Sequence, residues 1–232
     1  MSATVKGYLI FNGGEAFSPK SKMADHNWLQ LIRGKTRPRV VVVPAAATEK
    51  ERKTADEVMR YFNYMGTFAQ YAMIVDQRTA NTETEYMVLD KVEAIVLTDG
   101  SPYDMVERLR GTYTEAALRR ALERKAAVMA TGASAMALGA VYWLANTWET
   151  GLGIAPHLAI LPHHNVARMR LSPERLLARL PEGVTLVGVD QATALISHPD
   201  GQYQVEGSGQ VCVYRSVEQQ NSYPAGSYFT LS

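Results

Sequence analysis

The feature that most constrains the fold of this chain is a run of β-branched residues, Arg39-Val-Val-Val-Val43, which Pro44 closes. A strand that is apolar at successive positions is buried on both faces, and such strands are typical of parallel sheets covered by helices on both sides. Further short apolar runs alternate with segments of helical spacing along the chain. The sequence therefore predicts an α/β fold, a three-layer sandwich with a mostly parallel sheet.

We predict strands at 7–11, 39–43, 68–75, 92–97, in the run before Ser134, and at 158–161, 184–189, 192–196, 202–205 and 211–214; we predict helices at 49–64, 113–125 and 171–180. In open parallel sheets, ligands bind at the carboxyl ends of the strands. The residues best suited to chemistry follow predicted strands: Gly13 and Gly14, Asp99 and Gly100, Ser134, and the pair His163 and His164. This agreement predicts a single site at that edge of the sheet.

Size and composition exclude several classes of protein. The 232 residues, 47% of them hydrophobic, fit one α/β domain spanning 1–232, and the net charge of +1 does not favour nucleic acid or an anionic membrane as partner. Cys212 is the one cysteine, so no disulfide can form within the chain, and we expect a cytoplasmic protein with Cys212 in its core. We see no signal peptide and no apolar run of the ~20 residues that a membrane-spanning helix needs.

The segment Ala126-Ala-Val-Met-Ala-Thr-Gly-Ala-Ser-Ala-Met-Ala-Leu-Gly-Ala140 is typical of a strand, a sharp turn and a helix. Small residues flank Ser134, as a tight strand-to-helix turn requires, so we expect its hydroxyl at the tip of the turn. The backbone N–H of Ala135 is then the natural donor to an oxyanion, with a second donor from the turn at Gly100. The segment predicts a nucleophilic serine.

A serine nucleophile needs a base and a group that orients the base. Of the five histidines, His163 and His164 follow a predicted strand about thirty residues after Ser134, so the base is one of these two. The orienting acid is Glu149, which lies between the serine and the histidines, or Asp190, which follows the strand at 184–189. Both choices stay open at this point.

Six motifs in order resemble the serine peptidase family of the cyanophycinases and the aspartyl dipeptidases (peptidase E). They are Gly7-Tyr-Leu-Ile-Phe-Asn-Gly-Gly-Glu15, Val41-Val-Val-Pro-Ala-Ala-Ala-Thr48, Gly132-Ala-Ser-Ala135 (similar to the family's Gly-Thr-Ser-Ala-Gly-Ala), Gly151-Leu-Gly-Ile-Ala-Pro156 with Leu161-Pro-His-His164, Gly188-Val-Asp-Gln-Ala-Thr-Ala-Leu195 and Glu206-Gly-Ser-Gly-Gln-Val211. No single motif is specific, but six in this order are.

The resemblance implies a class I glutamine amidotransferase-like fold with flavodoxin-like topology. It implies an exopeptidase or dipeptidase that cleaves aspartyl or β-aspartyl bonds of a small peptide through an acyl-enzyme, without metal or cofactor, and a possible homodimer. Ser134 would be the nucleophile, His163 (or His164) the base and Glu149 the acid. We count Arg168 and Arg170 as candidate substrate-binding residues, since guanidinium groups bind carboxylates. Asp99 is a third candidate substrate-binding residue.

Two departures from the family pattern give a second hypothesis. Met136 stands where the family has a glycine, and Asp99 replaces a glycine of the oxyanion turn, where a negative charge opposes a developing oxyanion. The alternative is therefore a catalytically altered or inactive member of the family that binds a small molecule or peptide.

Overall fold

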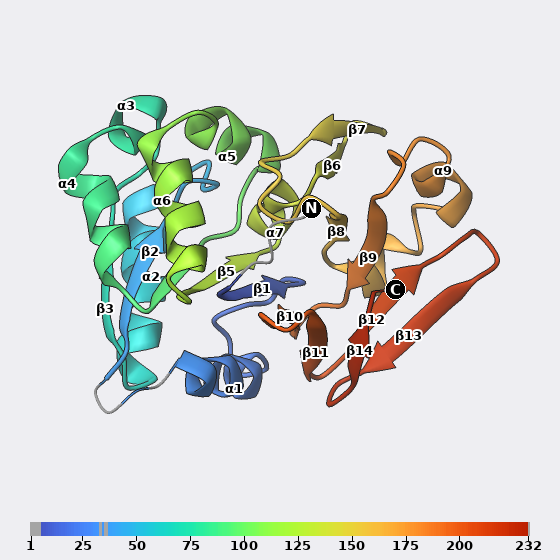
Figure 1. Cartoon of the computed structure of the whole chain (residues 1–232), viewed down its shortest axis with the longest axis horizontal. Helices are drawn as coiled ribbons and strands as arrows, with labels where there is room; N and C mark the ends of the chain where they lie inside the picture. The colour runs from blue at the N-terminus through green and yellow to red at the C-terminus, as the bar shows by residue number, and fades with distance from the viewer. Residues whose placement is uncertain (1–5, 33, 35–36, 232) are drawn as a thin grey trace.

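A computed structural model describes residues 6–32, 34 and 37–231 of the chain. Its centre is an eight-stranded sheet in the order β14-β11-β10-β1-β5-β4-β2-β3 (Figure 1). The strands are β1 (Tyr8–Asn12), β2 (Arg39–Val43), β3 (Phe68–Tyr71), β4 (Ala94–Leu97), β5 (Ala127–Thr131), β10 (Thr193–Ser197), β11 (Gln202–Gly207) and β14 (Tyr228–Thr230). The strands β1, β5, β4, β2 and β3 are parallel to one another, whereas β10 pairs antiparallel with β1 and with β11, and β11 pairs antiparallel with β14. The predicted mostly parallel central sheet is confirmed.

Successive residues of the central strands face two different cores. In β2, Val40 and Val42 pack with α1 (Lys22–Ile32) and α2 (Glu51–Tyr64), while Val41 and Val43 pack with the helices on the opposite face. Those helices are α5 (Pro102–Leu109), α6 (Tyr113–Glu123) and α7 (Ala133–Leu138). All four valines are fully buried, because helices cover both faces of the sheet. The predicted three-layer α/β sandwich is confirmed.

A smaller four-stranded sheet lies at one end of the large sheet (Figure 1). It contains β8 (Leu158–Leu161), β9 (Thr185–Val189), β12 (Gln210–Tyr214) and β13 (Gln220–Pro224), with a separate hairpin of β6 (Val141–Leu144) and β7 (Thr147–Thr150) beside it. Cys212 is buried in the core of this part with Leu176 and Leu186, as expected for a small core residue. The short helices α8 (His164–Ala167) and α9 (Pro173–Leu177) connect β8 to β9.

Several elements differ from the predicted ones. The strand predicted at 68–75 ends at Tyr71, and the helix predicted at 171–180 contains only Pro173–Leu177, with Ser172 as its N-cap. Elements that were not predicted from the sequence include α1, α5, the β6–β7 hairpin, β13 and β14, together with the helices α3 (Gln77–Ala80), α4 (Glu83–Tyr86) and η1 (Met87–Lys91). A single domain over 1–232 stays a prediction. Within the described part of the chain, every helix is too short or too polar to cross a membrane.

Candidate active site

The turn between β5 and α7 has Gly132 at its tip. β5 ends at Thr131 and α7 begins at Ala133, so Gly132 is the single residue between them. Its φ of 54° and ψ of −118° lie in a region that L-residues with a side chain rarely adopt. A Cβ built on Gly132 would lie 2.2 Å from each carboxylate oxygen of Asp99. A side chain at the tip would therefore extend into the space that Asp99 now fills.

The structure corrects the expected position of Ser134. Its side chain is fully buried in the first turn of α7, and its hydroxyl donates a hydrogen bond to the backbone carbonyl of Thr98 at the end of β4. The prediction failed because the strand extends through Thr131, which moves the tip of the turn two residues earlier than expected. Ser134 thus fastens α7 to β4, and it does not line the cavity described below.

The carboxylate of Asp99 accepts hydrogen bonds from the backbone N–H groups of the turn. Its Oδ1 accepts hydrogen bonds from the backbone N–H of Ala133 (2.7 Å) and from that of Gly100 (2.8 Å). The residue after the tip of such a turn normally supplies an oxyanion donor, and this residue is Ala133. The expected donors are corrected accordingly: Ala135 is buried inside α7, and the N–H of Gly100 already binds Asp99.

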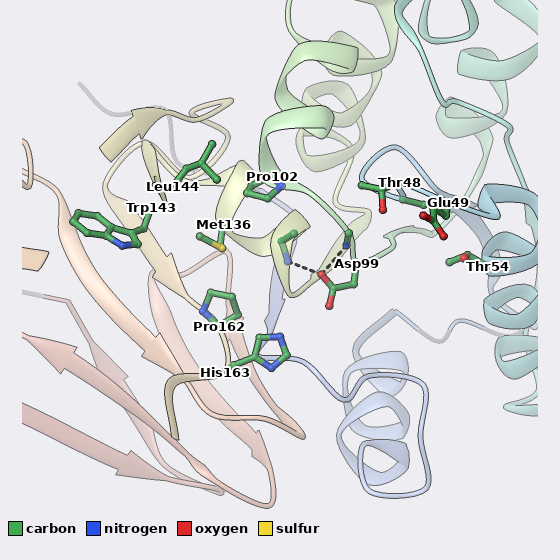
Figure 2. A pocket seen from close by; sticks show the side chains of 13 residues that line it. Thr48, Glu49, Thr54, Asp99, Pro102, Met136, Trp143, Leu144, Pro162 and His163 are labelled. Atoms are coloured by element: carbon green, nitrogen blue, oxygen red, sulfur yellow. Dashed lines mark hydrogen bonds between the residues drawn. The ribbon is translucent and has the colours of Figure 1, made fainter. Parts of the chain in front are cut away.

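A cavity of about 640 Å³ opens at this edge of the sheet, and a second cavity of about 460 Å³ adjoins it. Figure 2 shows Asp99 between two groups of lining residues in the first cavity, with Thr48 and Glu49 on one side and Met136 and Trp143 on the other. A volume in this range is typical of small-molecule sites. The predicted location of a site at the carboxyl ends of the strands agrees with this cavity.

His163 is the histidine that faces both cavities. It has a left-handed backbone (φ 50°), and its N–H donates to the carbonyl of Gly13 (2.7 Å). Its imidazole lies directly against Gly14, where an added Cβ would be 2.1 Å from Cε1 of the ring. The glycine turn after β1 thus leaves the space that the His163 ring occupies.

His164 points away from the cavities and is buried, with 2% of its surface exposed. Its Nδ1 lies 3.2 Å from Oδ1 of Asp190, and its Nε2 lies 2.7 Å from the hydroxyl of Tyr214. Burial lowers the pKa of His164, and the hydrogen bond with Asp190 offsets part of this effect. Gly188 provides the room for the ring, since a Cβ there would lie 2.2 Å from Cδ2. His164 as base is therefore corrected, because its ring is enclosed in a structural network.

The two candidate acids do not meet His163. Glu149 is exposed on β7 opposite Tyr142, and its charge contributes, after burial, to raising the pKa of the Tyr142 hydroxyl. Asp190 binds His164 instead, and its Oδ2 accepts from the N–H of Gln210. Among the described residues, neither carboxylate forms an ion pair with His163.

Of the remaining predicted residues, some line a cavity and others do not. Arg170 is exposed and lines the second cavity, whereas Arg168 is exposed and lines neither. Met136 lines both cavities, so it lies where they meet. The sequence analysis missed Gly132 and Trp143, although the positive φ that a strand-to-helix turn requires is a known reason for a glycine.

Two buried polar atoms at the same sheet edge have no hydrogen-bond partner among the described residues. They are Nδ2 of Asn12, at the end of β1, and Oγ1 of Thr98, directly before Asp99. Most buried polar groups are paired, and exceptions concentrate at functional sites. Among the described residues, no group of three or more His, Cys, Asp or Glu side chains is arranged to hold a metal ion.

Comparisons with known proteins agree with this architecture. A family model, Peptidase family S51, matches residues 9–202. The structure is similar to that of a peptidase from an acI-B1 actinobacterium, with 18% sequence identity and a TM-score of 0.86 over 98% of each chain. It is also similar to a putative peptidase E protein from Listeria monocytogenes, with 10% identity and a TM-score of 0.60 over 95% of this chain and 99% of the other. A comparison with curated proteins gives no match. Since the matched region spans most of the chain, the chain belongs to peptidase family S51, a family of serine peptidases.

Proposed function

We propose that this member of a serine peptidase family binds a short peptide or similar small molecule in the cleft without forming an acyl-enzyme. This is the catalytically altered alternative of the sequence analysis. The observation that carries it is the pair at the tip of the turn: Gly132 has no side chain, and the carboxylate of Asp99 fills the space that a nucleophile would need.

Acyl transfer needs a nucleophile within reach of the base and free N–H groups that receive the oxyanion. The hydroxyl of Ser134 is fully buried and already donates to the Thr98 carbonyl, so it is not available to His163. The N–H of Ala133 binds the Asp99 carboxylate. An oxyanion at this position would lose that donor and face a negative charge, which disfavours the transition state of a serine peptidase.

The motif register supports the same conclusion. When Thr131 is placed on the threonine of Gly-Thr-Ser-Ala-Gly-Ala, the serine of the motif falls on Gly132 and its second glycine falls on Ser134. In this register, Ala133 and Ala135 match both alanines of the motif. This register supports the proposal, because it has a glycine at the nucleophile position.

The cleft keeps the properties of a binding site. It combines large cavities, a partly exposed imidazole at His163, and apolar lining residues such as Met136 and Leu161. Sites for small ligands are concave and mainly apolar, with a few polar groups that fix orientation. Loss of the nucleophile leaves these properties unchanged.

The competing expectation is hydrolysis of aspartyl or β-aspartyl peptides through Ser134. The test is a panel of Asp-X, β-Asp-X and neutral dipeptides, together with a fluorophosphonate probe that labels activated serines, applied to the wild type and to Ser134→Ala. We expect no cleavage and no labelling of either protein. Cleavage or labelling that disappears in Ser134→Ala would overturn the proposal. A homodimer and a cytoplasmic location also stay predictions.

A further inference from the structure

We propose that the cleft selects a short peptide that carries a cationic side chain next to an aromatic one. This inference rests on the proposed function, because it names the ligand class of the same cleft. The two cavities share Met136, Trp143, Pro162 and His163, so they form one continuous cleft with two ends. The two ends differ in charge and in polarity, which gives a bound ligand a defined direction.

The first end is acidic. Glu49 and Asp99 line it, and no Lys or Arg is among its lining residues in the described part of the chain. Both Asp99 bonds to the turn use Oδ1, and no hydrogen bond from a described residue reaches Oδ2. The orphaned Oγ1 of Thr98 precedes this carboxylate in the chain. Figure 2 shows Asp99 in the middle of the lining residues and Glu49 to its right, close to Thr48 and Thr54. This end therefore offers acceptors for an ammonium or guanidinium group.

The second end is mainly apolar. Trp143, Leu161 and Leu171 line it, and Val166 exposes 40% of its surface there. Arg170 is the one basic residue among its lining residues in the described ranges, so a cation seated at this end is repelled. An aromatic side chain can cover this apolar surface, which Leu161, Val166 and Leu171 form. The cation consequently belongs at the Asp99 end and the aromatic group at the Leu171 end.

The same charges disfavour the acidic peptides that the sequence predicted as substrates. A carboxylate side chain at the first end would lie near Glu49 and Asp99 without a positive partner among the lining residues. Since both carboxylates are exposed, each ion pair is weakened by water, and we expect a preference of roughly two- to fivefold per charge.

The experiment is isothermal titration calorimetry of the full-length protein with four peptides capped at both ends. Acetyl-Arg-Phe-amide is the expected ligand. Its citrulline analogue removes the charge at nearly constant shape, acetyl-Glu-Phe-amide reverses the charge, and acetyl-Arg-Ala-amide removes the ring. We expect the arginine peptide to bind roughly two- to fivefold more tightly than the citrulline peptide and more tightly still than the glutamate peptide. The alanine peptide is expected to bind about tenfold more weakly.

The variant Asp99→Asn isolates the acidic end, because the amide oxygen can still accept from the N–H groups of Ala133 and Gly100. We expect it to reduce the discrimination between arginine and citrulline, while Glu218→Gln, which removes an exposed charge outside the cleft, leaves the discrimination unchanged. Equal affinity of the arginine and citrulline peptides, tighter binding of the glutamate peptide, or no binding of any peptide at millimolar concentration would overturn this inference. Serine-dependent cleavage or labelling would instead overturn the proposed function, so the two failures are distinguishable.

Discussion

The carboxylate of Asp99 lies in the space that a side chain at Gly132 would enter, 2.2 Å from the position of its Cβ. The two residues come from different strand ends, since Asp99 follows β4 and Gly132 follows β5. The two residues depend on each other. A glycine at the tip leaves room for the Asp99 carboxylate, and this carboxylate accepts a hydrogen bond from the N–H of Ala133.

We expect Gly132→Ala to lower the free energy of unfolding by about 1–2 kcal/mol, because alanine is strained at positive φ. In an Asp99→Gly background the cost should fall by roughly 0.5–1 kcal/mol, since the carboxylate is no longer in the way. Asp99→Asn keeps the volume of the side chain and is the control that should not relieve the cost. Urea denaturation of the single and double variants measures the coupling, and additive effects would contradict the close contact.

The double variant Gly132→Ser/Asp99→Gly should gain a reactive serine. The new hydroxyl would stand at the tip of the turn near the cleft that His163 lines, and the N–H of Ala133 would be free to receive an oxyanion. We expect labelling by a fluorophosphonate probe in the double variant, and loss of the labelling when His163→Ala is added. Labelling of the wild type at the same rate would show that the natural site already has a nucleophile.

Much of the fold could be predicted from the sequence because buried parallel strands are apolar at every position. The ranges of β2 and β8 were predicted to the residue, as 39–43 and 158–161. The β6–β7 hairpin was missed because its exposed strand β7, Thr147–Thr150, lacks the apolar run that marks a central strand.

The site could be located from the sequence but not assigned in detail. The strand-ending residues do meet at one edge, yet the identity of the tip depends on where β5 ends, and a shift of two residues exchanges Ser134 for Gly132. Likewise, only the backbone direction at His163, with φ of 50°, sends its ring into the cleft and leaves His164 in the core. Sequence spacing does not determine such local geometry.

The buried His164 should make the free energy of unfolding depend on pH. Burial lowers its pKa in the folded state below the value of about 6.5 in the unfolded chain, so the unfolded chain binds more protons as the pH falls. The free energy of unfolding is therefore expected to fall as the pH is lowered from 7.5 to 5. Chemical denaturation at several pH values should show a smaller slope for His164→Gln than for the wild type. Equal slopes would mean that the fold holds the imidazole and the imidazolium equally well.

Asp25 should have the opposite effect. The carboxyl is buried in α1, where it accepts hydrogen bonds from the Trp28 indole (3.1 Å) and the Tyr61 hydroxyl (2.8 Å). Burial raises its pKa from 3.8 to about 6, and the two hydrogen bonds offset part of this effect. The folded state therefore binds more protons than the unfolded chain between these pH values, and the resulting stability is lost as the pH rises through 6.

From pH 4 to pH 7.5 the Asp25 contribution to the free energy of unfolding should decrease by roughly 2 kcal/mol. Asp25→Asn removes the titration and keeps an oxygen for the Trp28 indole and an amide for the Tyr61 hydroxyl. We expect this variant to gain stability relative to the wild type as the pH rises, as measured by urea denaturation at both ends of the range. A constant difference between the two proteins at every pH would show that the carboxyl does not titrate there, and the burial of Asp25 in the fold would then need a different explanation.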